Sequence, residues 1–453
     1  MVARQREPHP FVPMMPSHSP PLWKRDASDL VSGMKRSEFS AEEVAESVLR
    51  RVAEREPEVA AWAWIDEAQV RRQARDLASS PIDLPLYGVP VGVKDIFDTH
   101  DMPTACGSPI YAGHIPGRDA TAVARLRAAG AVIMGKTATT EFAHAHPAAT
   151  VHPLDPARTP GGSSSGSAAA VADAMVPLAL GSQTGGSTIR PSAYCGIVGF
   201  KPTFGRIPTT GMKALAPSMD TVGIHARSAQ DAALLFSVLA EAPAVAPRRS
   251  LRPHRIRYFP GPYAAQASDA AMAALERCRH LLVRAGWDVQ MMDSASDEFQ
   301  ALSEDNRTIM AYEAAQTMRI EFDRHREKLS DEFASFLQAG HSVPKVRYEE
   351  AMARVVRCRR ALDARVGVSE VLMTLSAPGE APLQSEGTGS SVFNRAWTTL
   401  GVPCLTLPFG SGPAGLPLGV QFIARHGDDF GLLAAGAEIA RTIGDAPGRV
   451  ESR

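Results

Sequence analysis

The sequence predicts an α/β protein with a parallel or mixed β-sheet covered by helices. Short apolar runs suited to strands alternate with segments of helical periodicity through the first half of the chain, a pattern typical of such sheets. The chain has 453 residues, of which 44% are hydrophobic and 21% charged, so a large buried core can form. Beyond Arg227 the sequence becomes mainly helical and charged, and apolar strand patterns return from Val371.

The first half of the chain supplies most of the alternating elements. Ser40 and Glu43 form a capping box, which predicts a helix that ends at Glu56, before Pro57. A second helix is expected to precede it. The other elements expected here are strands over 61–65, 85–93 and 131–134 and helices over 67–78, 121–129 and 167–174.

The second half is expected to add a helical region of about 260–370, which could cover the mouth of a site and shape a substrate pocket. The elements expected here are helices over 228–241, 268–285, 297–366 and 431–443 and strands over 255–259, 401–408 and 418–423. The expected domain organisation is an irregular, proline-rich arm over 1–22 followed by a single domain over 23–453.

Charge and cysteine usage exclude several classes of function. The formal net charge is −1, so no general attraction to nucleic acid or to an anionic membrane is expected. The N-terminus has no apolar signal core, and no run of about eighteen apolar residues occurs. The five scattered cysteines predict neither a disulfide framework nor a zinc site, and reduced thiols suit a cytoplasmic protein.

Residues 159–204 are predicted to hold the reaction centre. They contain two Gly-Gly-Ser triplets, 161–163 and 185–187, separated by a small-residue segment and an apolar run. Glycine frees the backbone, so a neighbouring serine can present its hydroxyl beside several N–H groups, as nucleophilic acyl transfer requires. The apolar runs argue against a flexible linker, and the absence of Gly-Lys-Ser/Thr argues against a phosphate-binding loop.

Three further motifs follow the order of a known family. They are Gly-Val-Pro-Val-Gly-Val-Lys-Asp at 88–95, Gly-Phe-Lys-Pro-Thr at 199–203 and Gly-Leu-Pro-Leu-Gly-Val-Gln at 415–421. Together with 159–204, they make the chain resemble the amidase signature family over nearly its full length. The resemblance implies a mixed central sheet covered by helices on both faces, with a variable helical insert over the active site. It also implies no cofactor and no metal, and a homodimer is a family-level expectation.

The resemblance implies a Ser–cis-Ser–Lys triad of Ser187, Ser163 and Lys94, in which the peptide bond between Gly162 and Ser163 is cis. Ser187 would be the nucleophile and Ser163 a proton relay. Lys94 ends an apolar run, where desolvation would lower its pKa and leave some neutral amine to act as base. The backbone N–H groups expected to form the oxyanion hole are those of Thr184, Gly185, Gly186 and Ser187.

Two residues depart from the commonest pattern of the family. Gln183 stands where many members have aspartate, and Arg190 lies three rather than two residues after Ser187. This placement resembles a malonamidase-like subgroup, in which the arginine meets a substrate carboxylate. A structural salt bridge is the alternative for Arg190. The shift makes a tRNA-linked role less expected, although an amidotransferase-type subunit that delivers ammonia to a partner stays an alternative.

A different hydrolase is also conceivable from the same loop. Residues 162–166 satisfy Gly-x-Ser-x-Gly, the nucleophile elbow of α/β-hydrolases, with Ser164 at the centre. His426, near Asp428 and Asp429, could then complete an esterase triad. This interpretation explains neither the second Gly-Gly-Ser triplet nor the lysine.

The sequence therefore predicts an amidase that cleaves a C–N bond through an acyl-enzyme and takes a small amide, ureide or carbamate substrate. Two residue groups have open roles. The first comprises His144, His146 and His152, which lack the partners of a zinc site and are expected to be solvated. The second comprises Phe142, Met212, Phe393 and Trp397, which could line an apolar pocket or belong to the core.

Overall fold

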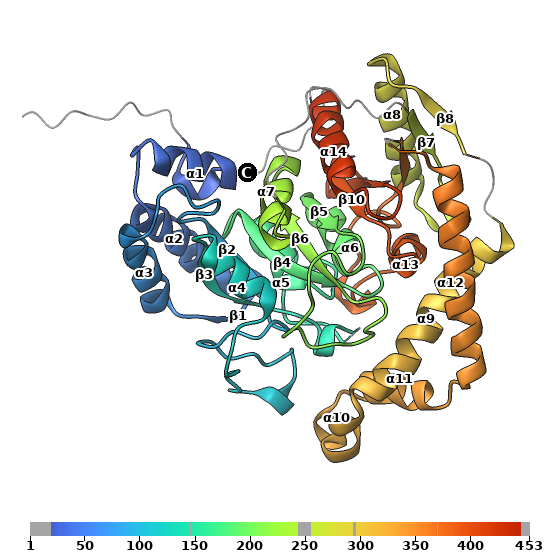
Figure 1. Ribbon diagram of the computed structural model, residues 1–453, viewed down its shortest axis with the longest axis horizontal. Coiled ribbons are helices and arrows are strands. Elements are labelled where there is room, and N and C mark those ends of the chain that lie inside the picture. The colour runs from blue at the N-terminus through green and yellow to red at the C-terminus, as the bar shows by residue number, and fades with distance from the viewer. Residues whose placement is uncertain (1–19, 145, 243–254, 293–295, 369, 445–453) are drawn as a thin grey trace, which may run out of the picture.

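The computed structural model describes residues 20–144, 146–242, 255–292, 296–368 and 370–444. Within them, eleven strands form a mixed sheet in the order β1-β3-β2-β4-β6-β5-β10-β11-β9-β7-β8, which confirms the predicted α/β class (Figure 1). The strands are β1 Trp62–Ile65, β2 Pro90–Lys94, β3 Val132–Thr137, β4 Leu178–Gln183, β5 Val198–Lys201, β6 Thr221–Ala226, β7 Arg255–Tyr258, β8 Val289–Met291, β9 Glu370–Leu375, β10 Cys404–Ser411 and β11 Pro417–Ile423.

Helices cover both faces of this sheet. Apolar residues of α2, α3 and α5 form a core against one face, and those of α4, α7, α8 and α14 form the larger core against the other. The helices are α1 Ala27–Lys35, α2 Ala41–Val59, α3 Glu67–Asp76, α4 Thr121–Ala128, α5 Ser165–Ala172, α6 Ile189–Cys195, α7 Ala229–Leu239, α8 Asp269–Arg284, α9 Asp297–Thr317, α10 Arg319–Arg324, α11 Asp331–His341, α12 Lys345–Arg365, α13 Val392–Thr399 and α14 Asp429–Gly444.

The parallel part of the sheet positions the site. Strand β2 pairs in parallel with both β3 and β4, for example through Val93 and Leu180. Parallel neighbours end at the same edge of a sheet. Lys94, Thr137 and Gln183, the last residues of these three strands, therefore lie along one edge.

Helix α5 packs so closely on the sheet that only small side chains fit. Its residues from Ser165 to Val171 are buried. A Cβ on Gly166 would lie 2.1 Å from the carbonyl oxygen of Ala61 and 2.4 Å from the backbone nitrogen of Ala138. Glycine at this position lets α5 start directly against β1 and the end of β3, which fixes the loop that precedes the helix.

Several elements differ from the sequence expectations, and strands β4, β5 and β6 were not among the strands expected. Helix α2 continues past Pro57 to Val59, because the proline falls in the last turn and Val59 is buried. The strand predicted over 85–93 begins at Pro90, because the chain before it turns at Gly88, where φ is +69°. Strand β8 was not expected, and it adds an edge to the sheet within the region predicted to be helical.

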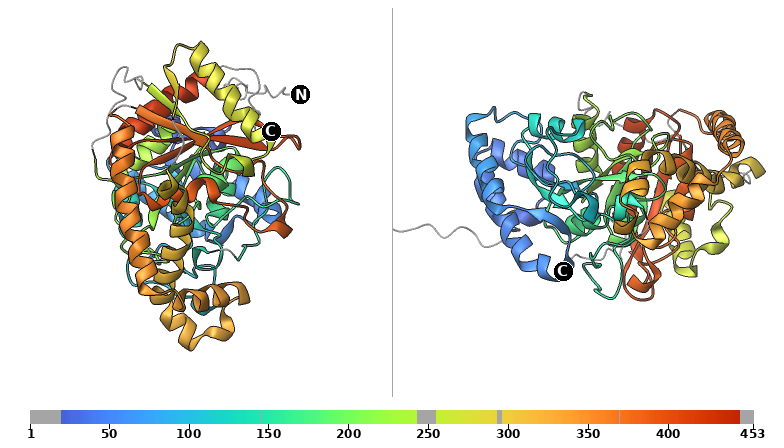
Figure 2. Two further views of the ribbon diagram at one scale, coloured as in Figure 1. Left: turned by 90° about the vertical axis from the view of Figure 1, so that its right-hand side faces the viewer. Right: turned by 90° about the horizontal axis from the view of Figure 1, so that it is seen from below.

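Helices α11 and α12 each pack against α9, and α10 and α11 project away from the sheet (Figure 2). The helical region predicted over about 260–370 is thus present, although β8 and the sheet-covering α8 also belong to it. Most of the predicted N-terminal arm, residues 1–19, lies outside the described residues. No helix of the described residues is long and apolar enough to cross a membrane.

Candidate active site

Lys94 is fully buried and bonded to two hydroxyl groups. Its Nζ donates to Ser163 Oγ at 2.8 Å and to Ser182 Oγ at 2.8 Å. Two of the three residues predicted for the triad are therefore in direct contact. Ser182 was missed by the sequence analysis, although it stands near the end of an apolar strand, as Lys94 does.

The surroundings of Lys94 favour the neutral amine. Burial lowers the pKa of Lys94 to about 7, and the negative charge of Asp220 opposes this shift. Among the described residues, no carboxylate forms an ion pair with Lys94. By contrast, Lys136, which is equally buried, pairs with Asp95 at 3.3 Å. The predicted desolvation of Lys94 is thus present; burial lowers the pKa of Lys136 as well, and the ion pair with Asp95 is what distinguishes Lys136 from Lys94.

Ser163 follows a cis peptide bond, as the family resemblance implied for Gly162 and Ser163. Its carbonyl oxygen accepts the N–H of Thr140 at 3.2 Å, and its hydroxyl accepts the amine of Lys94. Ser163 is 1% exposed, and its hydroxyl is bonded to the buried amine of Lys94.

The loop from Thr184 to Ser187 turns all of its carbonyl groups toward protein donors. Asn306 Nδ2 donates to the carbonyl oxygen of Thr184, and Thr398 Oγ1 donates to that of Gly185. The N–H of Arg190 donates to the carbonyl oxygen of Gly186, and the N–H of Ser164 donates to that of Ser187. In the described part of the chain, the N–H groups of Gly185, Gly186 and Ser187 have no acceptor. Buried N–H groups are rarely left unpaired. The loop therefore offers a set of oriented donors, as an oxyanion hole requires.

Ser187 stands at the end of this loop, and its residue is 8% exposed. The N–H of Ser164 donates to the Ser187 carbonyl oxygen at 3.4 Å, which joins the two Gly-Gly-Ser segments directly after Ser163. All three residues predicted for the triad thus come from segments that meet at one edge of the sheet.

The hydrogen bonds of Gln183 show what this residue does in place of the aspartate found in many members of the family. Its Oε1 accepts the N–H groups of Thr188 and Ile189 at 2.9 and 3.0 Å, and its Nε2 donates to Thr398 Oγ1 at 2.9 Å. An ionised aspartate could accept these N–H groups but could not donate to Thr398. Gln183 therefore ties the start of α6 to α13, and through Thr398 it also supports Gly185.

Asp220 fixes the first residue of the loop. Its Oδ1 accepts the hydroxyl of Thr184 at 2.6 Å, and its Oδ2 accepts the N–H groups of Leu215 and Ala216 at 2.8 and 3.0 Å. Burial raises the pKa of Asp220, and these hydrogen bonds oppose that shift. The loop conformation is therefore set by side chains outside it.

Arg190 lies on α6 and is 7% exposed. Its Nη2 donates to the carbonyl oxygen of Gly162 at 2.6 Å and to Thr388 Oγ1 at 3.2 Å, and its Nη1 donates to the carbonyl oxygen of Gly389. Within the described residues no carboxylate pairs with Arg190, and its Nε has no partner. These contacts do not support the salt bridge considered from the sequence.

The nucleophile-elbow interpretation finds no support in the contacts of Ser164. The Ser164 hydroxyl donates to the Ser182 carbonyl oxygen at 3.3 Å and accepts the Ser182 N–H at 3.2 Å. No hydrogen bond between Ser164 and His426 occurs in the part of the chain described here. Asp429 Oδ1 instead accepts the N–H of Thr203 at 2.7 Å.

The three histidines considered for a metal site are not solvated as a group. His152 is buried and His144 is half-buried, and His152 Nε2 lies 2.9 Å from the carbonyl oxygen of Tyr194. The ring of His144 stacks on Phe336, with centroids 3.9 Å apart. His146 is exposed. The expectation of solvated histidines was therefore wrong for two of them, because later parts of the chain pack over their loop.

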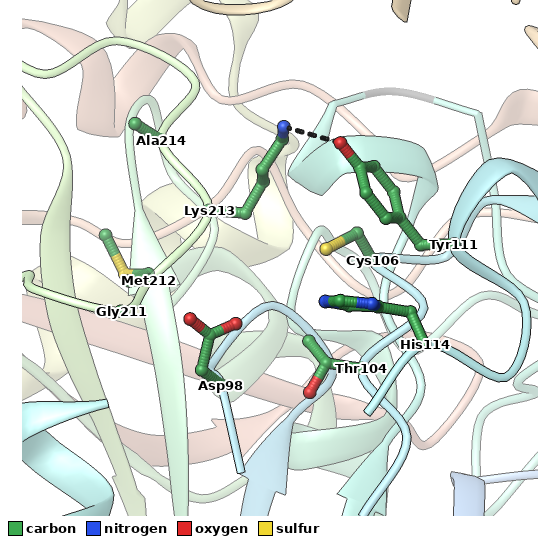
Figure 3. A pocket seen from close by; sticks show the side chains of 9 residues that line it. All are labelled: Asp98, Thr104, Cys106, Tyr111, His114, Gly211, Met212, Lys213 and Ala214. Atoms are coloured by element: carbon green, nitrogen blue, oxygen red, sulfur yellow. Dashed lines mark hydrogen bonds between the residues drawn. The ribbon is translucent and has the colours of Figure 1, made fainter. Parts of the chain in front are cut away.

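A cavity of about 260 Å³ lies beside the segment that follows Lys94 (Figure 3). Lys213 Nζ lies 3.3 Å from the hydroxyl of Tyr111 at this cavity, and the Lys213 amine also pairs with Glu321. Its lining residues are Asp98, Thr104, Cys106, Tyr111, His114, Gly211, Met212, Lys213 and Ala214.

The four apolar residues considered for a substrate pocket do not line one cavity together. Met212 lines the cavity of Figure 3, whereas Phe393 and Trp397 line a second one of about 20 Å³. Phe142 is a core residue that is 1% exposed. The five cysteines are buried and free.

Comparison with known proteins identifies the family. The sequence profile described as Amidase matches residues 43–433. The chain belongs to the amidase family. Members of this family are hydrolases that act on amides, so the predicted fold and the predicted class of reaction are confirmed at this level.

Known amidase-family proteins align with nearly the whole chain. A Mycobacterium tuberculosis protein named "Putative amidase AmiD" is 32% identical over 93% of this chain and 94% of its own length. A glutamyl-tRNA(Gln) amidotransferase subunit of Thermus thermophilus is 33% identical over 90% of this chain and 95% of its own. The structure of a peptide amidase from Stenotrophomonas maltophilia superposes with a TM-score of 0.79, at 27% identity over 94% of this chain and 98% of its own.

Proposed function

We propose that this amidase hydrolyses the C–N bond of a small amide through an acyl-enzyme on Ser187. The observation that carries the proposal is the buried amine of Lys94, which forms no ion pair with a described carboxylate and lies 2.8 Å from Ser163 Oγ. A serine hydroxyl becomes a good nucleophile when a base removes its proton. With a pKa lowered to about 7, Lys94 is neutral in a large share of molecules at neutral pH.

In the first step, neutral Lys94 accepts the Ser163 proton while Ser163 accepts the Ser187 proton. Ser187 Oγ attacks the amide carbonyl carbon, and the N–H groups of the loop from Thr184 to Ser187 stabilise the oxyanion. The C–N bond then breaks as the proton held by Lys94 returns through Ser163 to the leaving nitrogen, which departs as ammonia or an amine. Water hydrolyses the Ser187 ester along the same proton path and regenerates the enzyme.

Arg190 is proposed to bind a carboxylate of the substrate, as in the malonamidase-like subgroup. It lies three residues after Ser187, it has no carboxylate partner among the described residues, and its Nε is unpaired. Because both Nη atoms already donate to Gly162, Thr388 and Gly389, Nε is the donor proposed for the carboxylate, and the charge of the guanidinium strengthens that hydrogen bond. We place the reaction with the hydrolases of non-peptide C–N bonds. We propose that the enzyme is cytoplasmic, that it needs no metal or cofactor, and that it can form a homodimer.

Trapping with hydroxylamine tests the acyl-enzyme. An acyl group on Ser187 can pass to hydroxylamine instead of water, so the enzyme should produce the hydroxamate of the substrate acid. Ammonia release and hydroxamate formation should share one dependence on substrate concentration. If the enzyme releases ammonia but forms no hydroxamate, even at the highest hydroxylamine concentration at which the protein stays folded, direct attack by water would be favoured.

The second candidate is a subunit that delivers ammonia to a partner, and the similarity to the glutamyl-tRNA(Gln) amidotransferase chain favours it. This candidate uses the same acyl-enzyme but needs a second polypeptide to consume the ammonia. Hydrolysis of a free amide by the purified single chain at a rate of at least about 1 per second would favour the stand-alone amidase. Activity that appears only with a co-purified polypeptide would favour the second candidate.

A further inference from the structure

One face of helix α9 carries three polar side chains that bond to segments around the oxyanion loop, the segment from Thr184 to Ser187. The three residues are Asn306, Glu313 and Thr317, which are seven and four positions apart and therefore share one face of the helix. Asn306 and Glu313 are buried, and Thr317 is half-buried. Buried polar side chains normally bind other protein groups, so the partners of these residues indicate what this face does.

Asn306 holds the first residue of the oxyanion loop. Its Nδ2 donates to the carbonyl oxygen of Thr184 at 3.1 Å and to Thr399 Oγ1 at 3.0 Å, and it lies 3.2 Å from Met219 Sδ. Thr399 belongs to α13, and its hydroxyl donates to a carbonyl oxygen of that helix. Asn306 therefore ties Thr184 to α9 and, through Thr399, to α13.

This contact also sets the direction of an N–H group of the oxyanion loop. The carbonyl group of Thr184 and the N–H of Gly185 belong to one planar trans peptide unit, so they point in opposite directions. The hydrogen bond from Asn306 therefore aims the N–H of Gly185 away from α9. This N–H has no acceptor among the described residues, and it is one of the donors proposed for the oxyanion hole. Asn306 thus lies one peptide unit away from a group that would meet the reacting oxygen.

The other two polar residues of this face hold the turn over residues 215–220. Glu313 Oε2 accepts the N–H of Ser218 at 2.9 Å. Thr317 Oγ1 donates to the carbonyl oxygen of Leu215 at 3.0 Å. Both ends of the turn are thereby fastened to α9.

Asp220 carries the position of this turn to the oxyanion loop, because its Oδ1 accepts the hydroxyl of Thr184 at 2.6 Å. Helix α12 joins the same network through Tyr348, whose hydroxyl donates to Glu313 Oε1 at 2.8 Å. Thr184 is therefore held twice by the helical region, directly by Asn306 and indirectly through the turn.

We propose that Asn306, Glu313 and Thr317 are positioning residues that aim the N–H donors of the oxyanion loop. The helical region is then part of the catalytic framework as well as a cover for the site. This inference rests on the proposed acyl transfer at Ser187. An oxyanion hole acts on the charge that develops in the transition state, so misaligned donors should lower kcat and leave KM nearly unchanged.

Two substitutions on α9 test this expectation with ammonia release from an amide. Asn306→Ala frees the carbonyl group of Thr184, so kcat should fall about tenfold or more while KM stays within about twofold. Thr317→Val keeps the shape of the side chain and removes only the hydroxyl. Its kcat should fall about threefold, because the effect reaches Thr184 only through the turn. Far-UV circular dichroism shows whether each variant is folded.

Glu313 allows a test by rescue. Glu313→Ala leaves the N–H of Ser218 without its acceptor, so kcat should fall about threefold or more. Glu313→Gln keeps an oxygen for this N–H, and its amide group can donate to the hydroxyl of Tyr348. This variant should therefore recover most of the wild-type kcat. Equal losses in the alanine and glutamine variants would contradict a positioning role for the contact with Ser218.

The rate at which a serine-directed fluorophosphonate labels Ser187 needs no amide substrate. The phosphonyl oxygen gains negative charge during the attack, as a carbonyl oxygen does, so the rate should fall in Asn306→Ala by about the same factor as kcat. Gln316→Ala is the matched control, because Gln316 has an exposed amide side chain on the same helix. This variant should leave kcat and the labelling rate unchanged.

The outcomes separate this inference from the proposed function. If kcat and the labelling rate stay within about twofold of wild type in both Asn306→Ala and Thr317→Val, the inference is overturned and the acyl-enzyme mechanism still stands. A loss confined to KM overturns it as well. If Asn306→Ala does not fold, Asn306→Asp replaces it, because an ionised carboxylate of the same size cannot donate to Thr184. Failure of the fluorophosphonate to label Ser187 in the wild-type enzyme contradicts the proposed function itself.

Discussion

Raising the pH from 6 to 8 is expected to increase kcat/KM for an amide about tenfold. The base must be neutral, and the pKa of Lys94 is lowered to about 7. About 9% of the amine is then neutral at pH 6 and about 91% at pH 8. A solvent-exposed lysine with its usual pKa would be neutral in about 3 molecules in 10,000 at pH 7. Burial at this site thus increases the fraction of neutral Lys94 at pH 7 about a thousandfold.

The assay is ammonia release at low substrate concentration, because kcat/KM reports the ionisation of the free enzyme. Circular dichroism at each pH shows that the fold is intact. His225 does not account for a titration in this range, because burial holds its pKa at about 3, with the charge of Lys94 contributing. A rate that falls from pH 6 to 9, or one that rises only above pH 10, would refute the desolvated lysine as base.

Two substitutions probe the supporting contacts. Ser182→Ala removes one of the two acceptors of the Lys94 amine, so we expect kcat to fall about tenfold, the equivalent of about 1.4 kcal/mol. The far-UV circular dichroism of this variant should be unchanged. An unchanged kcat would mean that Ser182 does not help to orient the amine. Gly186→Ala places a Cβ 2.5 Å from Asn394 Oδ1 and displaces the unpaired N–H groups, so kcat should fall about 10²–10³-fold while Ser187 remains present. Near-normal kcat in Gly186→Ala would argue against these N–H groups as the oxyanion hole.

Local sequence patterns predicted the framework of this protein well. The capping box at Ser40 and Glu43 starts α2 as expected, because both halves of its reciprocal hydrogen bonding lie within one helical turn. The apolar run that ends at Lys94 correctly predicted a buried lysine at a strand end. The two Gly-Gly-Ser segments marked the loops at the edge of the sheet. These features depend on neighbours in the sequence, so a single chain reveals them.

Contacts between distant segments could not be predicted in the same way. Ser182 meets Lys94 because β2 and β4 are adjacent parallel strands, and no local pattern states which strands pair. The partners of Arg190 at Thr388 and Gly389 lie about 200 residues away in the sequence, as does the contact of Thr398 with Gly185.

Identification of the serine that becomes covalently modified tests the central claim most directly. The enzyme is treated with a serine-directed fluorophosphonate and digested, and the modified peptide is located by mass spectrometry. The account predicts a single adduct on Ser187 in the wild-type enzyme and a rate of labelling at least about 100-fold lower in Lys94→Ala. An adduct on Ser164, or labelling of Ser187 that proceeds at the same rate without the lysine, would contradict it.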